Sequence, residues 1–92
     1  MAAPVKDQQS IEKLILTSWT IAGRDANEIE ILRPYENGRY NENWSDSMWY
    51  KIITTAKVEI CLPRAAIDDA LQCRDYDRLV SSIRLRSPCA SE

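Results

Sequence analysis

The sequence predicts an α+β fold in which helices pack against an antiparallel sheet. Three observations carry this prediction: a helical apolar stripe near the N-terminus, a hairpin signal followed by a long apolar–polar alternation, and a second helical pattern near the end. The chain order is therefore an N-terminal helix, a three-stranded antiparallel meander, and one or two C-terminal helices. A length of 92 residues is that of one domain. We expect residues 1–92 to form a single domain, with a helix at 7–22, a hairpin at 27–44, a strand at 50–62, a helical region at 64–86 and a tail at 87–92.

The first helix is indicated by apolar residues that recur every three to four positions, which gives an amphipathic helix one apolar stripe. Asp7 is the expected N-cap, because its carboxylate can accept hydrogen bonds from the free amides of the first turn. Gly23 stands where a helix end needs a left-handed residue. The stripe consists of Ile11, Leu14, Ile15, Trp19 and Ala22.

The hairpin is indicated by the pair Asn37-Gly38, because a type I′ turn needs positive φ at both central residues. Folding the chain at this turn brings opposite charges together, one aromatic residue against another, and an aliphatic residue against a tryptophan. Such cross-strand pairs stabilise a ladder by up to about 1 kcal/mol each. The predicted pairs are Glu36 with Arg39, Tyr35 with Tyr40, Arg33 with Glu42, and Ile31 with Trp44.

The predicted hairpin has an apolar face for the core and an acidic face for solvent. Pro34 is compatible with it if this part of the strand is an edge. The alternative is a short helix that begins with a capping box at Asp25 and Glu28 and ends before Pro34. In the hairpin, the core face carries Ile29, Ile31, Tyr35, Tyr40 and Trp44, and the opposite face carries Glu28, Glu30, Glu36, Asn41 and Asn43.

From Met48 to Leu62 mostly apolar residues occupy the even positions and polar residues the odd ones, which is the period of a strand with one solvated face. This stretch is too long for one ordinary strand. We expect either a bend near Thr54-Thr55 or a first turn of helix capped by Ser45, so that residues 45–53 could be strand or helix.

Pro63 ends the strand and begins the C-terminal helical region. Asp75 is expected to cap a restart of the helix. The residues expected to face inward are Ile67, Ala70, Leu71, Leu79, Val80 and Ile83, with Asp68 and Asp69 facing outward.

The chain contains no histidine, which removes Ser-His and Cys-His nucleophile pairs, most catalytic zinc sites and most general-base schemes near neutral pH. Its two isolated glycines, Gly23 and Gly38, cannot build a phosphate-binding loop. The aspartates at 68, 69, 75 and 77 are interpreted as solvated helix surface and caps, not as magnesium ligands. We therefore expect no enzyme, no cofactor and no metal site.

The cysteines at 61, 73 and 89 include no C-x-x-C pair, so neither a zinc site nor a redox motif is indicated. We expect reduced thiols, with Cys61 passive, in a cytoplasmic protein. The longest apolar run, Leu14-Ile15-Leu16, is far short of a membrane span, and the N-terminus lacks the apolar stretch of a secretion signal.

The net charge of −2 is unevenly distributed. Residues 25–46 hold six acids and two bases, whereas the C-terminal helical region is rich in arginine. The acidic hairpin face is either a charge-protected edge or a surface complementary to a basic patch on a partner. Binding of free duplex DNA is disfavoured by the acidic total. The predicted partner-binding residues are Glu28, Glu30, Glu36, Asn37, Arg39, Glu42, Arg78, Arg84 and Arg86.

A short α+β chain with acidic residues around Asn37-Gly38 and arginines on its last helix resembles the small phage-encoded anti-CRISPR inhibitors of type I complexes. The resemblance is one of size and character, because these inhibitors share no signature motif. It implies docking on the proteins of a multisubunit CRISPR complex in the host cytoplasm, with possible contact to its guide RNA, so that target DNA is blocked. The alternative is a small regulatory or antitoxin-like module that binds a protein partner and touches nucleic acid through Arg78, Arg84 and Arg86. A structural component of a larger assembly is a third interpretation.

Overall fold

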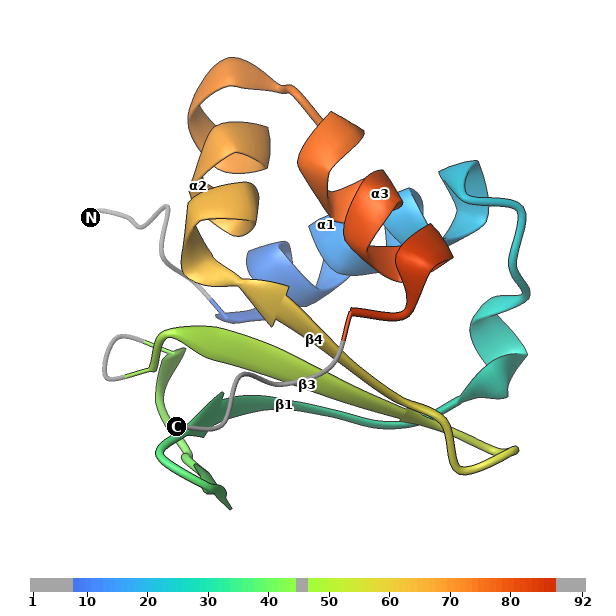
Figure 1. The fold of residues 1–92 in the computed structure, drawn as a ribbon. Helices are drawn as coiled ribbons and strands as arrows, with labels where there is room; N and C mark the ends of the chain where they lie inside the picture. The colour runs from blue at the N-terminus through green and yellow to red at the C-terminus, as the bar shows by residue number, and fades with distance from the viewer. Residues whose placement is uncertain (1–7, 45–46, 88–92) are drawn as a thin grey trace.

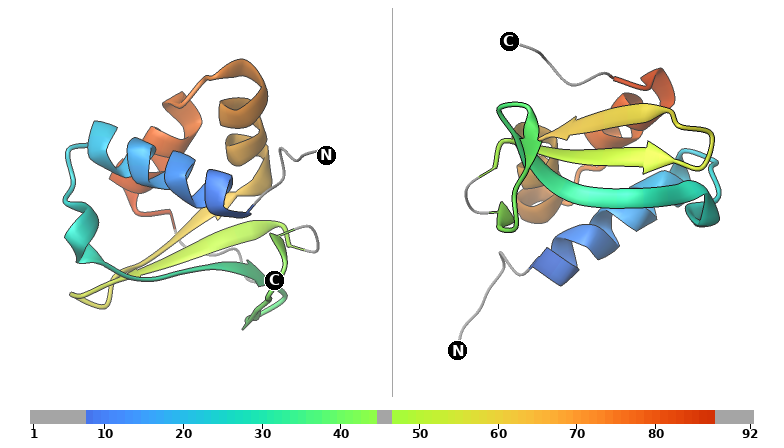
Figure 2. Two further views of the ribbon diagram at one scale, coloured as in Figure 1. Left: turned by 180° about the vertical axis from the view of Figure 1, so that it is seen from behind. Right: turned by 90° about the horizontal axis from the view of Figure 1, so that it is seen from below.

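A computed structural model describes residues 8–44 and 47–87. Within these residues three α-helices lie on one face of a four-stranded antiparallel sheet, and no helix lies on the opposite face (Figures 1 and 2). We call the latter the helix-free face. The strand order is β2-β1-β3-β4. The helices are α1 (Gln8–Ile21), the 3-10 turn η1 (Ala26–Glu28), α2 (Arg64–Cys73) and α3 (Asp77–Leu85), and the strands are β1 (Ile29–Glu36), β2 (Arg39–Tyr40), β3 (Trp49–Thr54) and β4 (Glu59–Pro63).

The N-terminal helix forms where its apolar stripe predicts it. Ile11, Ile15 and Trp19 are fully buried. Gly23 has a φ of +87°, and its amide donates to the carbonyl of Thr20 (2.9 Å), so the left-handed helix end is confirmed. The predicted cap Asp7 lies outside the described residues.

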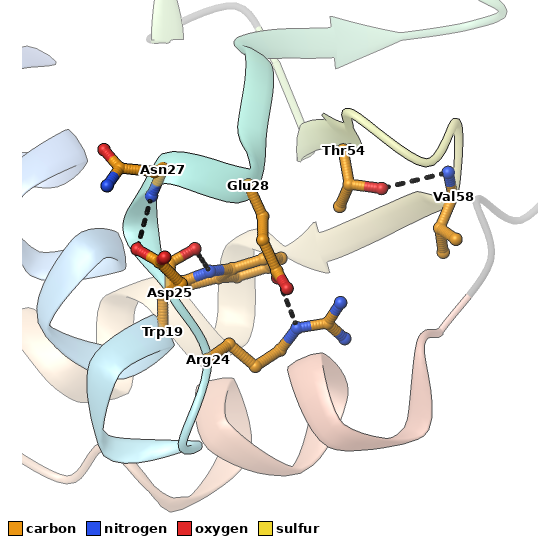
Figure 3. A network of polar contacts seen from close by, with 7 residues as sticks. All are labelled: Trp19, Arg24, Asp25, Asn27, Glu28, Thr54 and Val58. Atoms are coloured by element: carbon orange, nitrogen blue, oxygen red, sulfur yellow. Dashed lines mark hydrogen bonds and ion pairs between the residues drawn. The ribbon is translucent and has the colours of Figure 1, made fainter.

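The junction between α1 and β1 is a polar network around Trp19 (Figure 3). The indole Nε1 donates to the carbonyl of Asp25 (2.9 Å), and the Arg24 guanidinium lies 4.8 Å from the Trp19 ring centroid. The carboxylate of Asp25 accepts from the amide of Asn27 (2.9 Å), so Asp25 does cap a helical turn. The alternative of a short helix ending before Pro34 holds only for this three-residue turn, because the chain continues as β1 from Ile29.

The predicted three-stranded meander is wrong in strand count, because residues 50–62 contain a hairpin. It is also wrong in strand order, because β3 pairs with β1 and not with β2. The bend expected near Thr54-Thr55 reverses the chain: the amide of Thr54 donates to the carbonyl of Val58 (3.0 Å), and the Thr54 hydroxyl accepts from the Val58 amide (3.1 Å; Figure 3). Lys57 provides the left-handed residue of this turn, with a φ of +67°. A lysine carries no turn signature, which is why the alternation reads as one strand. Residues 49–53 are strand, and residues 45–46 lie outside the described part.

The β1–β2 hairpin is shorter than predicted. Glu36 opposite Arg39 and Tyr35 opposite Tyr40 are confirmed. The two pairs farther from the turn are wrong, because β2 ends at Tyr40 and β3 takes its place along β1. Arg33 is opposite Lys51, Ile31 is opposite Ile53, and the carbonyl of Pro34 accepts from the amide of Asn41 (3.0 Å).

The assignment of β1 side chains to the two faces also differs from the prediction. A register shift between Ile29 and Ile31 moves the alternation by one position, so Leu32 and Pro34 lie opposite the buried Ile52 and Tyr50. Residues 31, 35 and 40 therefore lie on the helix-free face and not in the core. Ile29 and Trp44 do reach the core.

The two C-terminal helices are confirmed. The chain breaks between them at Arg74, which has a φ of +56°, and the carboxylate of Asp75 accepts from the amide of Asp77 (3.0 Å). None of the helices in the described stretches is long or apolar enough to cross a membrane. The buried residues contributed by α2 and α3 are Ala66, Ile67, Ala70, Leu79, Val80 and Ile83.

Cys61 corrects the expectation of reduced, passive thiols. It is fully buried and disulfide-bonded, whereas Cys73 is a free, exposed thiol. The backbone amide of Cys61 donates to the carbonyl of Ser87 (2.8 Å), so the chain returns to the edge of β4 after α3. Cysteine spacing carries no information on connectivity, so the bond could not be read from the sequence.

Candidate functional site

The β1–β2 hairpin bends away from the helix layer and projects beyond the sheet (Figures 1 and 2). We call residues 36–42 the hairpin tip. Asn37 and Gly38 have φ values of +52° and +83°, as the predicted turn requires. Asn37, Arg39 and Glu42 are exposed. Glu36 is half-buried, and its Oε1 accepts from the amide of Met48 (2.8 Å), which ties the tip to the residue before β3.

The remaining predicted acids lie at the other end of β1. Glu28 forms an ion pair with Arg24 (Nε–Oε1 3.1 Å), and Glu30 with Lys57 (Nζ–Oε1 2.9 Å). At about 3.3 Å per residue, Glu30 and Glu36 are roughly 20 Å apart along the strand. The structure thus divides the predicted acidic residues into two groups, of which only the hairpin tip projects from the sheet.

The predicted arginines belong to the helix layer. Arg78 pairs with Asp69 (Nε–Oδ2 3.4 Å), and both side chains are largely exposed, so the pair contributes little to stability. Arg84 and Arg86 are exposed at the C-terminal end of α3. Because α3 lies above the sheet and the hairpin tip below it in Figure 1, the structure does not bring α3 together with the acids of the hairpin tip.

The helix-free face carries a row of aromatic residues that the sequence reasoning did not assign to a site. Tyr40, Tyr35 and Trp49 are consecutive cross-strand neighbours on β2, β1 and β3. The two tyrosine rings meet edge to face, with centroids 5.5 Å apart and an interplanar angle of 72°. Tyr40 is 38% exposed, and Tyr35 and Trp49 are half-buried.

The next row on this face is cationic, with Arg33 opposite Lys51. Arg33 is exposed, whereas Lys51 is only 9% exposed. The Lys51 Nζ lies 4.4 Å from the Tyr35 ring centroid and 5.7 Å from that of Tyr40, and it forms an ion pair with Glu59 (3.2 Å). Burial lowers the pKa of Lys51 and the hydrogen bond with Glu59 raises it, with a net upward direction. We call Tyr35, Tyr40, Trp49, Arg33 and Lys51 the aromatic platform.

One polar contact lies between the sheet and α1. Tyr50 is fully buried, and its hydroxyl donates to Glu12 Oε2 (2.8 Å). Burial and this hydrogen bond raise the pKa of Tyr50, so the residue stays protonated and acts as a structural donor. A shallow hollow on the surface of α1 is lined by Gln9, Ser10, Glu12, Lys13 and Leu16.

No group of three His, Cys, Asp or Glu side chains is arranged to hold a metal ion in residues 8–44 and 47–87. Comparisons with protein-family models, with curated proteins and with solved structures give no significant match to this chain. A function therefore has to be inferred from the hairpin tip and the aromatic platform.

Proposed function

We propose that this protein is a non-catalytic inhibitor that docks on an RNA-guided, multisubunit type I CRISPR complex in the host cytoplasm and blocks target DNA. The observation that carries the proposal is the projecting hairpin tip, which presents Glu42, Asn37 and Arg39 to solvent. The resemblance in size and character to anti-CRISPR inhibitors supplies the class of partner.

The hairpin tip suits docking because its shape is fixed before a partner arrives. The Tyr35–Tyr40 contact and the bond from Met48 to Glu36 hold its base. A preorganised element loses less conformational freedom on binding. Its carboxylates complement a basic, nucleic-acid-binding channel, and complementary charge speeds encounter and excludes wrong partners.

The test is co-purification with type I complexes, followed by a target-DNA shift assay. Glu42→Lys reverses an exposed charge on the hairpin tip without removing a hydrogen bond that holds it. We expect this variant to dock at least tenfold more weakly than the wild type. Asp68→Lys, on α2, is the matched control, because it makes the same charge change far from the hairpin tip.

Failure to form a complex with any CRISPR effector would overturn the proposal. Equal weakening by Glu42→Lys and Asp68→Lys would show that net charge matters and the hairpin tip does not. Because a disulfide such as that at Cys61 is uncommon in a reducing cytosol, docking is measured both with and without reductant.

The regulatory or antitoxin-like alternative draws on Arg84 and Arg86, which are exposed at the end of α3. It requires salt-sensitive binding of the isolated protein to nucleic acid, and loss of that binding in an Arg84→Ala/Arg86→Ala double variant. That result, without docking on a CRISPR complex, would replace the inhibitor proposal.

A further inference from the structure

We infer that the aromatic platform on the helix-free face binds single-stranded nucleic acid, with bases stacked on its aromatic rings and the backbone contacted by Arg33. This assigns a binding activity to the isolated chain and does not depend on the CRISPR partner proposed above. The shared chemistry is an unpaired base with its phosphate, which single-stranded RNA and DNA both provide.

The first step is the arrangement of the rings. Tyr40, Tyr35 and Trp49 occupy neighbouring strands, which lie about 4.8 Å apart in a sheet, so they form one continuous row. The row lies on the helix-free face, which is the face of the sheet turned to the viewer in the view from below (Figure 2). Proteins that hold single strands use such aromatic rows, because every base has a π-face on which it can stack.

The second step is the position of the cation. Arg33 lies two residues from Tyr35 on the same face of β1, about 7 Å along the strand. Its exposed side chain can reach the phosphate of a nucleotide whose base lies on Tyr35. Lys51 acts differently: it is enclosed beside Tyr35 and Tyr40 and paired with Glu59, so it is a positioning residue for the two rings.

The third step is the choice of occupant. In a duplex the faces of the bases are stacked on one another, and proteins that bind duplexes usually have strongly basic surfaces, whereas this chain has a net charge of −2. An acidic peptide would need several free cations, but Arg33 is the one exposed cation among the residues of the platform. A surface with three aromatic rings and one exposed cation therefore fits unpaired bases better than either rival.

The experiment measures fluorescence anisotropy of labelled oligouridine and oligothymidine, each about fifteen nucleotides long, with a duplex of equal length alongside. Because Trp19 and Trp44 are buried, quenching of tryptophan emission reports on Trp49. We expect Tyr40→Leu and Trp49→Leu each to weaken binding about tenfold or more. Arg33→Ala should lower the slope of log affinity against log salt by about 0.7.

The matched control is Lys13→Ala, which removes an exposed cation from α1, outside every proposed binding surface, and should leave the affinity unchanged. Thermal unfolding of each variant separates lost binding from lost folding. No binding to either single strand at low salt would overturn the inference. So would equal affinity for the duplex, binding that survives both leucine substitutions in folded protein, or binding of polyglutamate in place of the oligonucleotides.

Discussion

Arg64 joins the first turn of α2 to the segment that leads into β3, and its replacement by alanine should destabilise the protein strongly. Its Nε donates to the carbonyl of Ser47 (2.9 Å), and its Nη2 donates to the carbonyl of Trp44. The guanidinium also lies 4.1 Å from the centroid of the Trp44 ring. Trp44 and Ser47 are only 3% and 1% exposed, so both carbonyls belong to buried residues.

The magnitude follows from these three contacts. A hydrogen bond from a charged donor contributes about 1.5–3 kcal/mol, and a cation–π contact about 0.5–1 kcal/mol near the surface. Arg64 itself is half-buried, so water can replace part of each hydrogen bond after truncation. Taking the lower end for the two hydrogen bonds and for the cation–π contact, we expect Arg64→Ala to lower the free energy of unfolding by about 3.5 kcal/mol.

Urea unfolding followed by tryptophan fluorescence measures this loss, and thermal unfolding should show a drop of about 4–8 °C per kcal/mol for a domain of this size. Arg64→Lys keeps the charge but loses the planar guanidinium, so its free energy of unfolding should lie between those of the wild type and Arg64→Ala. The exposed Arg84→Ala serves as control and should change stability by less than about 0.5 kcal/mol. If Arg64→Ala were as stable as that control, the assigned role of the guanidinium would be refuted.

Three further predictions concern the Tyr50 hydroxyl and the two turns. Because the pKa of Tyr50 is raised in the folded state by burial and by Glu12, stability is complete below about pH 10 and falls as the pH rises beyond it. Tyr50→Phe should cost about 1 kcal/mol at pH 7 and flatten this decline in urea unfolding, and an unchanged decline would contradict the assignment. Lys57→Gly should stabilise the protein by about 0.5–1 kcal/mol, because glycine adopts the left-handed φ at this position without strain. Lys57→Ala keeps the strain, so a higher melting temperature for Lys57→Ala than for Lys57→Gly would contradict this prediction. Gly38→Ala should cost about 1–2 kcal/mol in the same assay through its φ of +83° alone, since no atom lies within 4 Å of an added Cβ, and a much larger loss would point to a steric clash.

The helices were predictable from sequence because their signals are local. The stripe from Ile11 to Trp19, the left-handed Gly23 and the bond from the Asp77 amide to the Asp75 carboxylate each depend on residues within a few positions, although Tyr76 and not Asp75 is the N-cap of α3. The same holds for the turn at Asn37-Gly38, and thus for the hairpin tip.

The strand count, the register of β1 and the aromatic platform could not be predicted, because they depend on pairings between residues that are distant in the sequence. The turn at Lys57 has no sequence signature, so one strand was predicted where two exist. The register shift after Ile29 reverses which side chains of β1 face the core, and no local sequence pattern predicts this shift. The aromatic platform was missed for this reason, since it exists only once Tyr35 is known to lie opposite Trp49.

The placement of β1 beside β3 also sets the order in which the sheet can assemble. The β3–β4 hairpin closes through a short local turn, whereas Ile29 must find Thr54 across the intervening hairpin. Closing the longer loop costs more chain entropy, so we expect β1 to dock after β3 and β4 have paired. Residues that become ordered late affect the rate of unfolding more than the rate of folding. Substitutions at β1 positions that pair with β3, such as Ile31 and Leu32, should therefore speed unfolding more than they slow folding.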